Sequence, residues 1–200
     1  CEEPTFFGLS PMGSRAMAGT LMPQQVLAAQ GPEGNSLGEA LAFIGGDAQR
    51  LDEVRRRPGE IVGYLELHIE QGSVLEREGV PIGVVTAIAA PCRGRATLAG
   101  SADHAGATMM NERQDALCGA AELVLAVERI CGAPDISDTV GTIGYLSVSP
   151  NMVNVIPGRV EMQVDVRSTR QDYLDRALGQ VKQALSSVAE ARGLEASLQW

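Results

Sequence analysis

The sequence is poor in histidine, lysine and aromatic residues. Of its 200 residues 4% are aromatic, two are histidine, and Lys182 is the only lysine. Nearly all of the basic charge is therefore carried by arginine, whose planar guanidinium suits bidentate binding of carboxylates. Two histidines cannot by themselves complete a catalytic zinc site, which usually takes three protein ligands and a water molecule. A metal site would need carboxylate ligands, or ligands from sequence outside this chain.

Long apolar runs and cysteine pairs are also lacking. No stretch reaches the roughly 18 apolar residues that span a bilayer, and no charged-then-apolar leader opens the chain, so we expect neither a membrane protein nor an exported one. Cys1, Cys92, Cys118 and Cys131 form no C-x-x-C pair, which favours reduced thiols in a cytoplasmic protein. The 25 acidic against 16 basic residues give a net charge of −9, which argues against nucleic-acid or anionic-membrane partners. Because the chain lacks an initiator methionine, we expect it to be a piece of a longer protein.

Residues 1–91 carry loops and short helices. One short helix is expected near residues 23–30, within a stretch rich in glycine, proline and methionine. Ser36 precedes the next helix with capping-box spacing, and Asp47 is expected to cap a third helix that turns Leu51 and Val54 inward. These elements predict part of an α/β layer with too few strands to close a sheet of its own.

Two runs in this region read as strands. In GYLELHIEQG, residues 63–72, a period of two places Glu66, His68 and Glu70 on one face and apolar residues on the other. This pattern predicts a strand with one buried face and one chemical face. The run VPIGVVTAIAA, residues 80–90, is predicted to be a strand buried on both faces.

From residue 92 onward the expected order of elements is β-α-β-β-α-β. Alternation and helical spacing predict four strands and two helices, at 93–100, 113–130, 139–147, 159–167, a helix capped by Thr169 and closed by Gly193, and 194–200. This is the split arrangement of a ferredoxin-like α+β domain, with two helices on one face of an antiparallel sheet. We therefore expect two domains, residues 1–91 and 92–200.

Two candidate chemical positions lie in the first of these domains. Glu2 and Glu3 are adjacent carboxylates that can divide labour, one binding a metal ion and the other taking a proton from a bound water, although such pairs are also common on surfaces. His68 ends a predicted strand, where α/β sheets tend to place ligand sites. A structural histidine with no ligand is the alternative for His68.

Two further candidate positions lie in the second domain. His104 is in a glycine-containing loop, residues 101–111, that could present its imidazole to a substrate oxygen. Asn154 lies in a turn, and Arg167 ends a strand beside Asp165. Arg167 suits a substrate carboxylate, while a structural ion pair with Asp165 is the alternative.

Taken together and in this order, the motifs resemble one family. They are Glu2-Glu3-Pro4, Gly13-Ser14-Arg15, ELHIEQG at 66–72, His104-Ala105-Gly106 with Arg113 and Asp115-Ala116-Leu117, and Asn154-Val155-Ile156-Pro157-Gly158 followed by Asp165-Val166-Arg167. Across essentially the whole chain they resemble the N-carbamoyl-L-amino-acid hydrolases and allantoate amidohydrolases, which belong with the aminoacylase- and carboxypeptidase-type di-metal amidohydrolases. ELHIEQG and NVIPG are highly specific as a pair.

The resemblance implies a role for each candidate residue. Glu2 matches the general base, and Glu3 and His68 match metal ligands. His104 matches the lid histidine that polarises the scissile carbonyl and stabilises its oxyanion. Asn154 and Arg167 match the residues that bind the substrate carboxylate. The implied reaction is hydrolysis of the C–N bond of an N-carbamoyl-L-amino acid or an allantoate-like ureido acid.

The resemblance also implies cofactors and a partner. The complete enzyme would hold two divalent metal ions, Zn, Mn, Co or Ni, and residues 92–200 would be a lid or dimerisation domain that pairs with a second subunit and supplies residues to the site. The family's His-x-Asp and bridging Asp would precede Cys1, and its late metal-binding His would follow Trp200. We therefore expect this fragment to be inactive alone, whether or not it binds a metal ion.

Three positions depart from the family pattern. Phe6 stands where an Arg is usual, Pro91 where a Gln often contacts substrate, and Met109 where the histidine loop normally has Pro. The change at Pro91 bears on the identity of the substrate. Two alternative functions are a non-catalytic dimerisation module and a peptidase or deacylase of the same superfamily, although His68 and the Asn154 and Arg167 pair favour the carbamoyl branch.

Overall fold

The computed structural model describes residues 6–200, and the chain forms two compact units that meet in the sequence at Glu78 and Gly79. Each unit has an apolar core of its own. The sheet of the second unit starts at Ala90. The domain limits expected at residues 91 and 92 stay a prediction, because compactness alone does not define a domain.

Short helices make up the regular structure in the described part of the first unit. They are α1 (Met12–Ala18), α2 (Pro23–Ala28), α3 (Leu37–Phe43), the 3₁₀ turn η1 (Ala48–Arg50), α4 (Leu51–Val54) and α5 (Val74–Glu78). Ser36 Oγ accepts the backbone N–H of Glu39 at 3.4 Å, and Asp47 Oδ1 accepts that of Gln49 at 2.8 Å, so both predicted caps are confirmed. The prediction that Val54 points inward is wrong: its side chain is 42% exposed, since it ends a four-residue helix beyond the small core that Leu51 contacts.

Neither of the two predicted strands of this region forms. Residues 61–70 and 82–89 have no regular secondary structure, and their apolar side chains are exposed, with Leu65 at 96%, Leu67 at 90% and Val84 at 88%. A strand is stable only when a neighbouring strand satisfies its backbone N–H and C=O groups. Within residues 6–200 the strands of the second unit pair with one another, so these segments have no partner strand.

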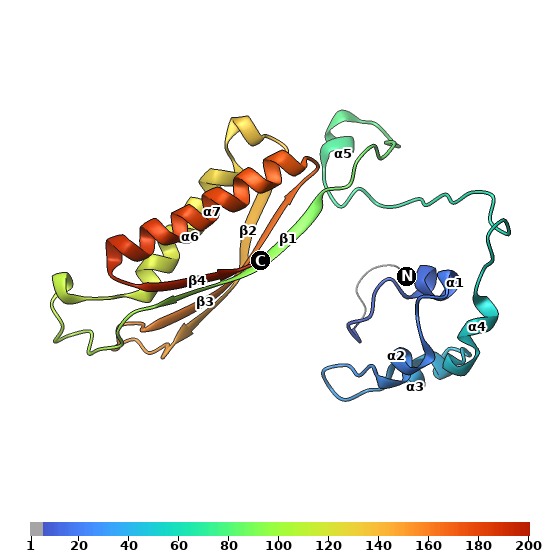
Figure 1. Ribbon diagram of the computed structural model, residues 1–200, viewed down its shortest axis with the longest axis horizontal. Coiled ribbons are helices and arrows are strands. Elements are labelled where there is room, and N and C mark those ends of the chain that lie inside the picture. The colour runs from blue at the N-terminus through green and yellow to red at the C-terminus, as the bar shows by residue number, and fades with distance from the viewer. Residues whose placement is uncertain (1–5) are drawn as a thin grey trace. The chain divides into compact units, whose positions relative to one another are not determined.

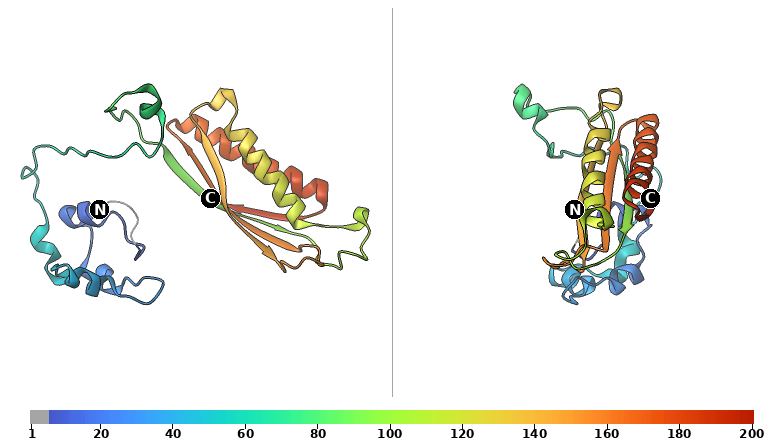
Figure 2. Two further views of the ribbon diagram at one scale, coloured as in Figure 1. Left: turned by 180° about the vertical axis from the view of Figure 1, so that it is seen from behind. Right: turned by 90° about the vertical axis from the view of Figure 1, so that its left-hand side faces the viewer.

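The second unit is an α/β structure around a four-stranded antiparallel sheet. Its elements in order are β1 (Ala90–Ala99), the 3₁₀ turn η2 (Met110–Glu112), α6 (Ala116–Cys131), the 3₁₀ turn η3 (Pro134–Ile136), β2 (Val140–Ser149), β3 (Arg159–Ser168), α7 (Gln171–Arg192) and β4 (Glu195–Gln199). The strands lie in the order β2-β3-β1-β4, and Figures 1 and 2 show α6 and α7 on one face of the sheet. The predicted sequence of strands and helices is therefore confirmed.

The core of this unit lies between the sheet and the two helices. On β3 the predicted alternation is confirmed, since Val160, Met162, Val164 and Val166 are all buried. They pack against apolar residues of the other elements, including Leu98, Leu123, Val127, Val181 and Leu185. The other face of the sheet carries mostly polar side chains, such as Arg95, Gln163 and Asp165.

The start of α7 differs from the expectation. The N-cap is Arg170, not Thr169, and no side chain caps the helix. The Thr169 hydroxyl is unavailable because it donates to the Asp138 carboxylate, which also accepts the backbone N–H of Thr169 at 3.0 Å and the hydroxyl of Ser168 at 2.9 Å. Asp138 thus ties the turn before β2 to the junction of β3 and α7.

This junction predicts a pH-dependent stability. The hydrogen bond from the Thr169 hydroxyl, with smaller contributions from Ser168 and the backbone, lowers the pKa of Asp138. A carboxyl whose pKa is lowered on folding stabilises the protein above its unfolded pKa of about 3.9 and loses that effect as the pH falls through the folded value. Asp138→Asn should therefore lower the free energy of unfolding at pH 7 and make its decline below about pH 4 shallower. Urea unfolding at pH 7 and pH 3 measures this, with Asp175→Asn on the surface of α7 as the control. An equal loss for Asp138→Asn at both pH values would contradict it.

The described cysteines are free thiols. Burial raises the pKa of Cys131, whose sulfur lies against Gly141 of β2, and burial also raises the pKa of Cys118. A protonated thiol is a poor nucleophile, so neither thiol is activated, and the buried Cys131 acts as a packing residue. No helix within residues 6–200 combines the length and the apolar character needed to cross a bilayer.

Candidate active site

The loop that carries His104 is joined to the turn that carries Asn154. A β-bridge pairs His104 with Val155, the Ala105 N–H donates to the Asn154 carbonyl at 3.0 Å, and the Ile156 N–H donates to the Asp103 carbonyl at 2.8 Å. The structure therefore brings together two predicted site residues that lie fifty positions apart in the sequence.

The ring of His104 is held in one tautomer. The backbone N–H of Gly106 donates to Nδ1 at 3.0 Å, so Nδ1 carries the lone pair and the neutral ring carries its proton on Nε2. The Asp103 carboxylate accepts the backbone N–H of His104 at 2.7 Å, and the Thr108 hydroxyl donates to the His104 carbonyl at 3.1 Å. The exposed imidazole thus offers an Nε2–H donor, the group that a developing oxyanion requires.

The Arg113 guanidinium hydrogen-bonds to backbone carbonyls of this loop. Its Nη2 donates to the carbonyl oxygens of Ala105 at 2.6 Å and Thr108 at 3.1 Å, and its Nε donates to Thr108 at 3.1 Å. Two residues later Asp115 caps α6 by accepting the N–H groups of Leu117 at 2.9 Å and Cys118 at 3.1 Å. No role for Arg113 is predicted from the sequence. The available signal was an arginine placed between a glycine-containing loop and a helix cap.

Removal of the Arg113 guanidinium should loosen the loop without unfolding the unit. In Arg113→Met the carbonyls of Ala105 and Thr108 lose their donors, while the aliphatic stem is kept. We expect the amides of Ala105 and Gly106 to exchange with solvent about tenfold faster, which corresponds to about 1.4 kcal/mol of lost local protection. Hydrogen exchange followed by NMR on the 200-residue chain measures this, with buried β3 amides as the internal control. Unchanged exchange at Gly106 would show that Arg113 does not hold the loop.

Arg167 lies at the opposite end of the sheet. It lies opposite Pro91 on the neighbouring strand β1. Its Nε and Nη2 donate to the two Asp165 oxygens at 2.8 and 3.0 Å. Arg93 donates to the same carboxylate at 2.9 Å. Hydrogen bonds from Arg167, and secondarily from Arg93, hold the pKa of Asp165 below its usual range although partial burial raises it. The structural ion pair weighed as the alternative is therefore present, and among residues 6–200 the Nη1 of Arg167 has no hydrogen-bond partner.

The length of β3 separates Arg167 from the His104 loop. Gly100 donates to the Gly158 carbonyl at 2.8 Å, so this loop starts where β3 begins at Arg159. Arg167 is eight residues further along β3, about 27 Å at 3.4 Å per residue. A single second unit therefore does not present Arg167 and His104 to one small substrate.

His68 belongs to the first unit and lies in the extended segment 61–70. Its Nδ1 lies 2.6 Å from the Ile69 carbonyl oxygen, which can only accept, so Nδ1 carries the proton and Nε2 the lone pair that a metal ion would use. The Glu70 carboxylate accepts the N–H groups of Val74 at 2.8 Å and of Leu75 at 3.1 Å, at the start of α5. This tautomer fits a metal ligand.

The predicted base and the other predicted metal ligand are at the N-terminus of the chain. Glu2 and Glu3 lie outside the residues that the structure describes. Across residues 6–200, no group of three or more histidine, cysteine, aspartate or glutamate side chains could hold a metal ion. His68 is therefore compatible with a metal site but does not define one.

Comparison with known proteins identifies the chain's relatives. The sequence matches no protein-family model. It is 42% identical over 193 residues to an N-carbamoyl-L-amino acid amidohydrolase from Geobacillus stearothermophilus, covering 96% of this chain and 46% of that protein. A ureidoglycolate hydrolase from Arabidopsis thaliana is 37% identical over 201 residues, covering 98% of this chain and 42% of that protein. A crystal structure of a hydantoinase/carbamoylase family amidase from Burkholderia ambifaria superposes with a TM-score of 0.82 and 34% identity, over 99% of this chain and 47% of that one.

All three relatives are named as hydrolases or amidases, enzymes of C–N bond hydrolysis. The chain is similar over nearly its whole length to N-carbamoyl-L-amino-acid hydrolases and related ureido-acid amidohydrolases, so the predicted resemblance is confirmed. It spans about half the length of the curated relatives it matches.

Proposed function

We propose that this chain forms part of a metal-dependent amidohydrolase that cleaves the C–N bond of N-carbamoyl-L-amino acids or allantoate-like ureido acids. The observation that carries the proposal is the bridged pair of loops that joins His104 to Asn154 and fixes the Nε2–H tautomer of His104. The names of relatives that match nearly the whole chain support the same reaction.

Each predicted site residue has a role in this reaction. Glu3 and His68 would hold a divalent ion, Zn, Mn, Co or Ni, together with ligands from outside the chain. When bound, such an ion lowers the pKa of a water molecule and polarises a carbonyl. Glu2 accepts the proton of the attacking water. His104 Nε2–H donates to the carbamoyl oxygen as negative charge develops on it, and Asn154 and Arg167 bind the substrate carboxylate.

The separation along β3 supports a site shared between two copies. A two-fold axis that pairs the second units in opposite directions would place the His104 end of one copy near the Arg167 end of the other. The second unit would then be the ferredoxin-like lid and dimerisation domain, and the enzyme a cytoplasmic homodimer.

Mixed dimers test the shared site. We expect His104→Ala and Arg167→Ala to be nearly inactive alone and an equal mixture, dissociated and reassembled, to recover activity. In a mixed dimer one site carries both changes and the other carries neither. With random pairing about half of the dimers are mixed, so the mixture should reach about a quarter of wild-type activity. A mixture no more active than its components would show that each site lies within one chain. Two wild-type preparations carried through the same reassembly are the control.

The reaction itself is tested on the longer protein. Purified with Mn²⁺ or Zn²⁺, it should hydrolyse at least one N-carbamoyl or ureido acid, and His68→Ala should lower its metal content. If it turned over none of these compounds and His68→Ala left its metal content unchanged, the proposal would be refuted. Appreciable turnover by the 200-residue chain alone would contradict the assignment of ligands outside it.

A further inference from the structure

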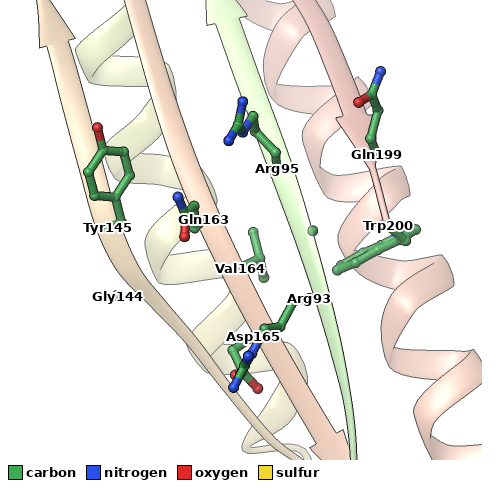
Figure 3. A pocket seen from close by; sticks show the side chains of 10 residues that line it. Arg93, Arg95, Gly144, Tyr145, Gln163, Val164, Asp165, Gln199 and Trp200 are labelled. Carbon is green, nitrogen blue, oxygen red and sulfur yellow. The ribbon is translucent and has the colours of Figure 1, made fainter. Parts of the chain in front are cut away.

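A groove crosses the open face of the sheet in the second unit. Its volume is about 520 Å³, and it lies on the face opposite α6 and α7 (Figure 3). The side chains that shape it come from all four strands and the residue after β4, and include Arg93, Arg95, Tyr145, Gln163, Asp165 and Trp200. Polar residues are ordinary on the open face of an antiparallel sheet, and the distinguishing features of this face are the charge and the arrangement of its side chains.

The strand register sets these side chains in cross-strand rows. Tyr145, Gln163, Arg95 and Gln199 lie opposite one another in a single row across the sheet. In the next row Arg93 faces Asp165, and Arg167 follows two residues beyond Asp165 on the same face. Diagonal neighbours of this kind have Cα atoms about 7 to 8 Å apart, within reach of long side chains. Arg93 therefore lies between the proposed carboxylate-binding Arg167 and Arg95.

This face carries an excess of positive charge. Asp165 is the one carboxylate that pairs with Arg93 and Arg167, and Arg95 has no ion pair or hydrogen bond to any other described side chain. The nearest further carboxylate along β3, Glu161, is paired with Arg159 at 2.9 Å. Three guanidiniums against one carboxylate leave a local charge of about +2 in a chain whose net charge is −9. Such a cluster is complementary to a small anion.

Aromatic rings border the groove on both sides. Trp200 lines one end of the groove after β4, and its ring lies against Gly94 of β1 on the side that faces the helices, where an added Cβ would crowd it. Tyr145 stands on the far side, on β2 (Figure 3). The groove is thus bounded by Tyr145, whose ring can pack against the aliphatic part of a ligand, and at its other end by Trp200, with guanidiniums between them.

We propose that this groove is the side-chain subsite of the substrate and that it selects N-carbamoyl-L-amino acids with an acidic side chain. Arg167 binds the α-carboxylate, while Arg95 and Arg93 bind the side-chain carboxylate. Asp165 acts as a positioning residue, since it fixes the planes of the Arg93 and Arg167 guanidiniums at once. The proposal rests on the proposed function and adds to it a class of substrate.

Binding to the 200-residue chain tests the subsite directly. The two probes are N-carbamoyl-L-aspartate and N-carbamoyl-L-asparagine, which are nearly the same size and differ by one negative charge. Titration is followed by calorimetry and by the fluorescence of Trp200, the only tryptophan in the chain. We expect the aspartate derivative to bind at least about tenfold more tightly, equivalent to about 1.4 kcal/mol, and to change the Trp200 emission.

Variants distinguish binding in the groove from a general effect of positive charge on the two affinities. Arg95→Gln should reduce the preference to within about twofold and leave the Kd of the asparagine derivative nearly unchanged. The matched control is Arg129→Gln, which removes the same charge from the exposed surface of α6 and should leave the preference intact. Asp165→Asn should weaken both probes by a similar factor, because it releases Arg167 as well as Arg93. Circular dichroism melts verify that each variant is folded.

Three outcomes would overturn the subsite. They are equal affinity for the two probes, no measurable binding of either, and a preference that survives Arg95→Gln. Hydrolysis is measured separately on the longer enzyme. Failure to hydrolyse any carbamoyl or ureido acid would refute the proposed function, while charge-selective binding in the groove would stand as a dicarboxylate site.

Discussion

Replacement of Gly100 by alanine is expected to lower the free energy of unfolding of the second unit by about 3 kcal/mol, at the upper end of typical overpacking costs. A Cβ on Gly100 would overlap the Gln114 carbonyl oxygen and would lie 2.7 Å from a methyl carbon of Leu194. The Gln114 carbonyl cannot move away easily, since it accepts the N–H of Ser101 at 3.1 Å. The clash falls where β1 gives way to the loop that carries His104.

Gly179→Ala provides the matched comparison. Gly179 is exposed within α7, and nothing lies within 4 Å of an added Cβ there. Alanine is the better helix former, so this substitution should raise the free energy of unfolding by about 0.8 kcal/mol. Urea unfolding followed by circular dichroism measures both variants. Losses of equal size at the two positions would show that the close approach at Gly100 is not the cause.

In the proposed amidohydrolase, replacement of His104 by alanine is expected to lower kcat by about 100- to 1,000-fold, the usual cost of removing one oxyanion donor. The Nε2–H acts on charge that develops only in the transition state, so KM should change little. Because the side chain is exposed, the free energy of unfolding should stay within about 0.5 kcal/mol of wild type.

Two further variants sharpen this expectation. His104→Gln keeps an N–H donor on a flexible side chain and should recover part of the lost kcat. Thr108→Val removes only the hydroxyl that donates to the His104 carbonyl and serves as the control for loop damage. If kcat of His104→Ala remained within threefold of wild type, or if KM rose while kcat held, His104 would not be the oxyanion donor.

The second unit was predictable because its signals are local. The alternation of Val160, Met162, Val164 and Val166 fixes which face of β3 is buried, and helical spacing locates α6 and α7. The caps at Ser36 and Asp47 were found for the same reason, since a cap needs only residues two or three positions away. Thr169 failed as a cap because Asp138, distant in sequence, takes its hydroxyl.

The extended segments could not be predicted in the same way. Their composition favours strands, but a strand needs a partner whose presence the segment itself does not encode. The site shows the same limit. Sequence motifs identified His104, Asn154 and Arg167 one by one. The bridge between His104 and Val155 brings the first two together, while the register of β3 places Arg167 at the far end. The tautomer of His104 and the hydrogen bonds of Arg113 likewise depend on backbone groups that no motif reveals.

The exposed segment 80–90 affects how the chain behaves in concentrated solution. It contains no charged residue, and its valines and isoleucines favour extended pairing with any free strand edge. Segments with high β-propensity and no charge are the ones that template aggregation, and Pro81 and Pro91 protect only its ends. The 200-residue chain should therefore self-associate as its concentration rises, so binding titrations are best made dilute. A single lysine at Thr86 would act as a gatekeeper against that association.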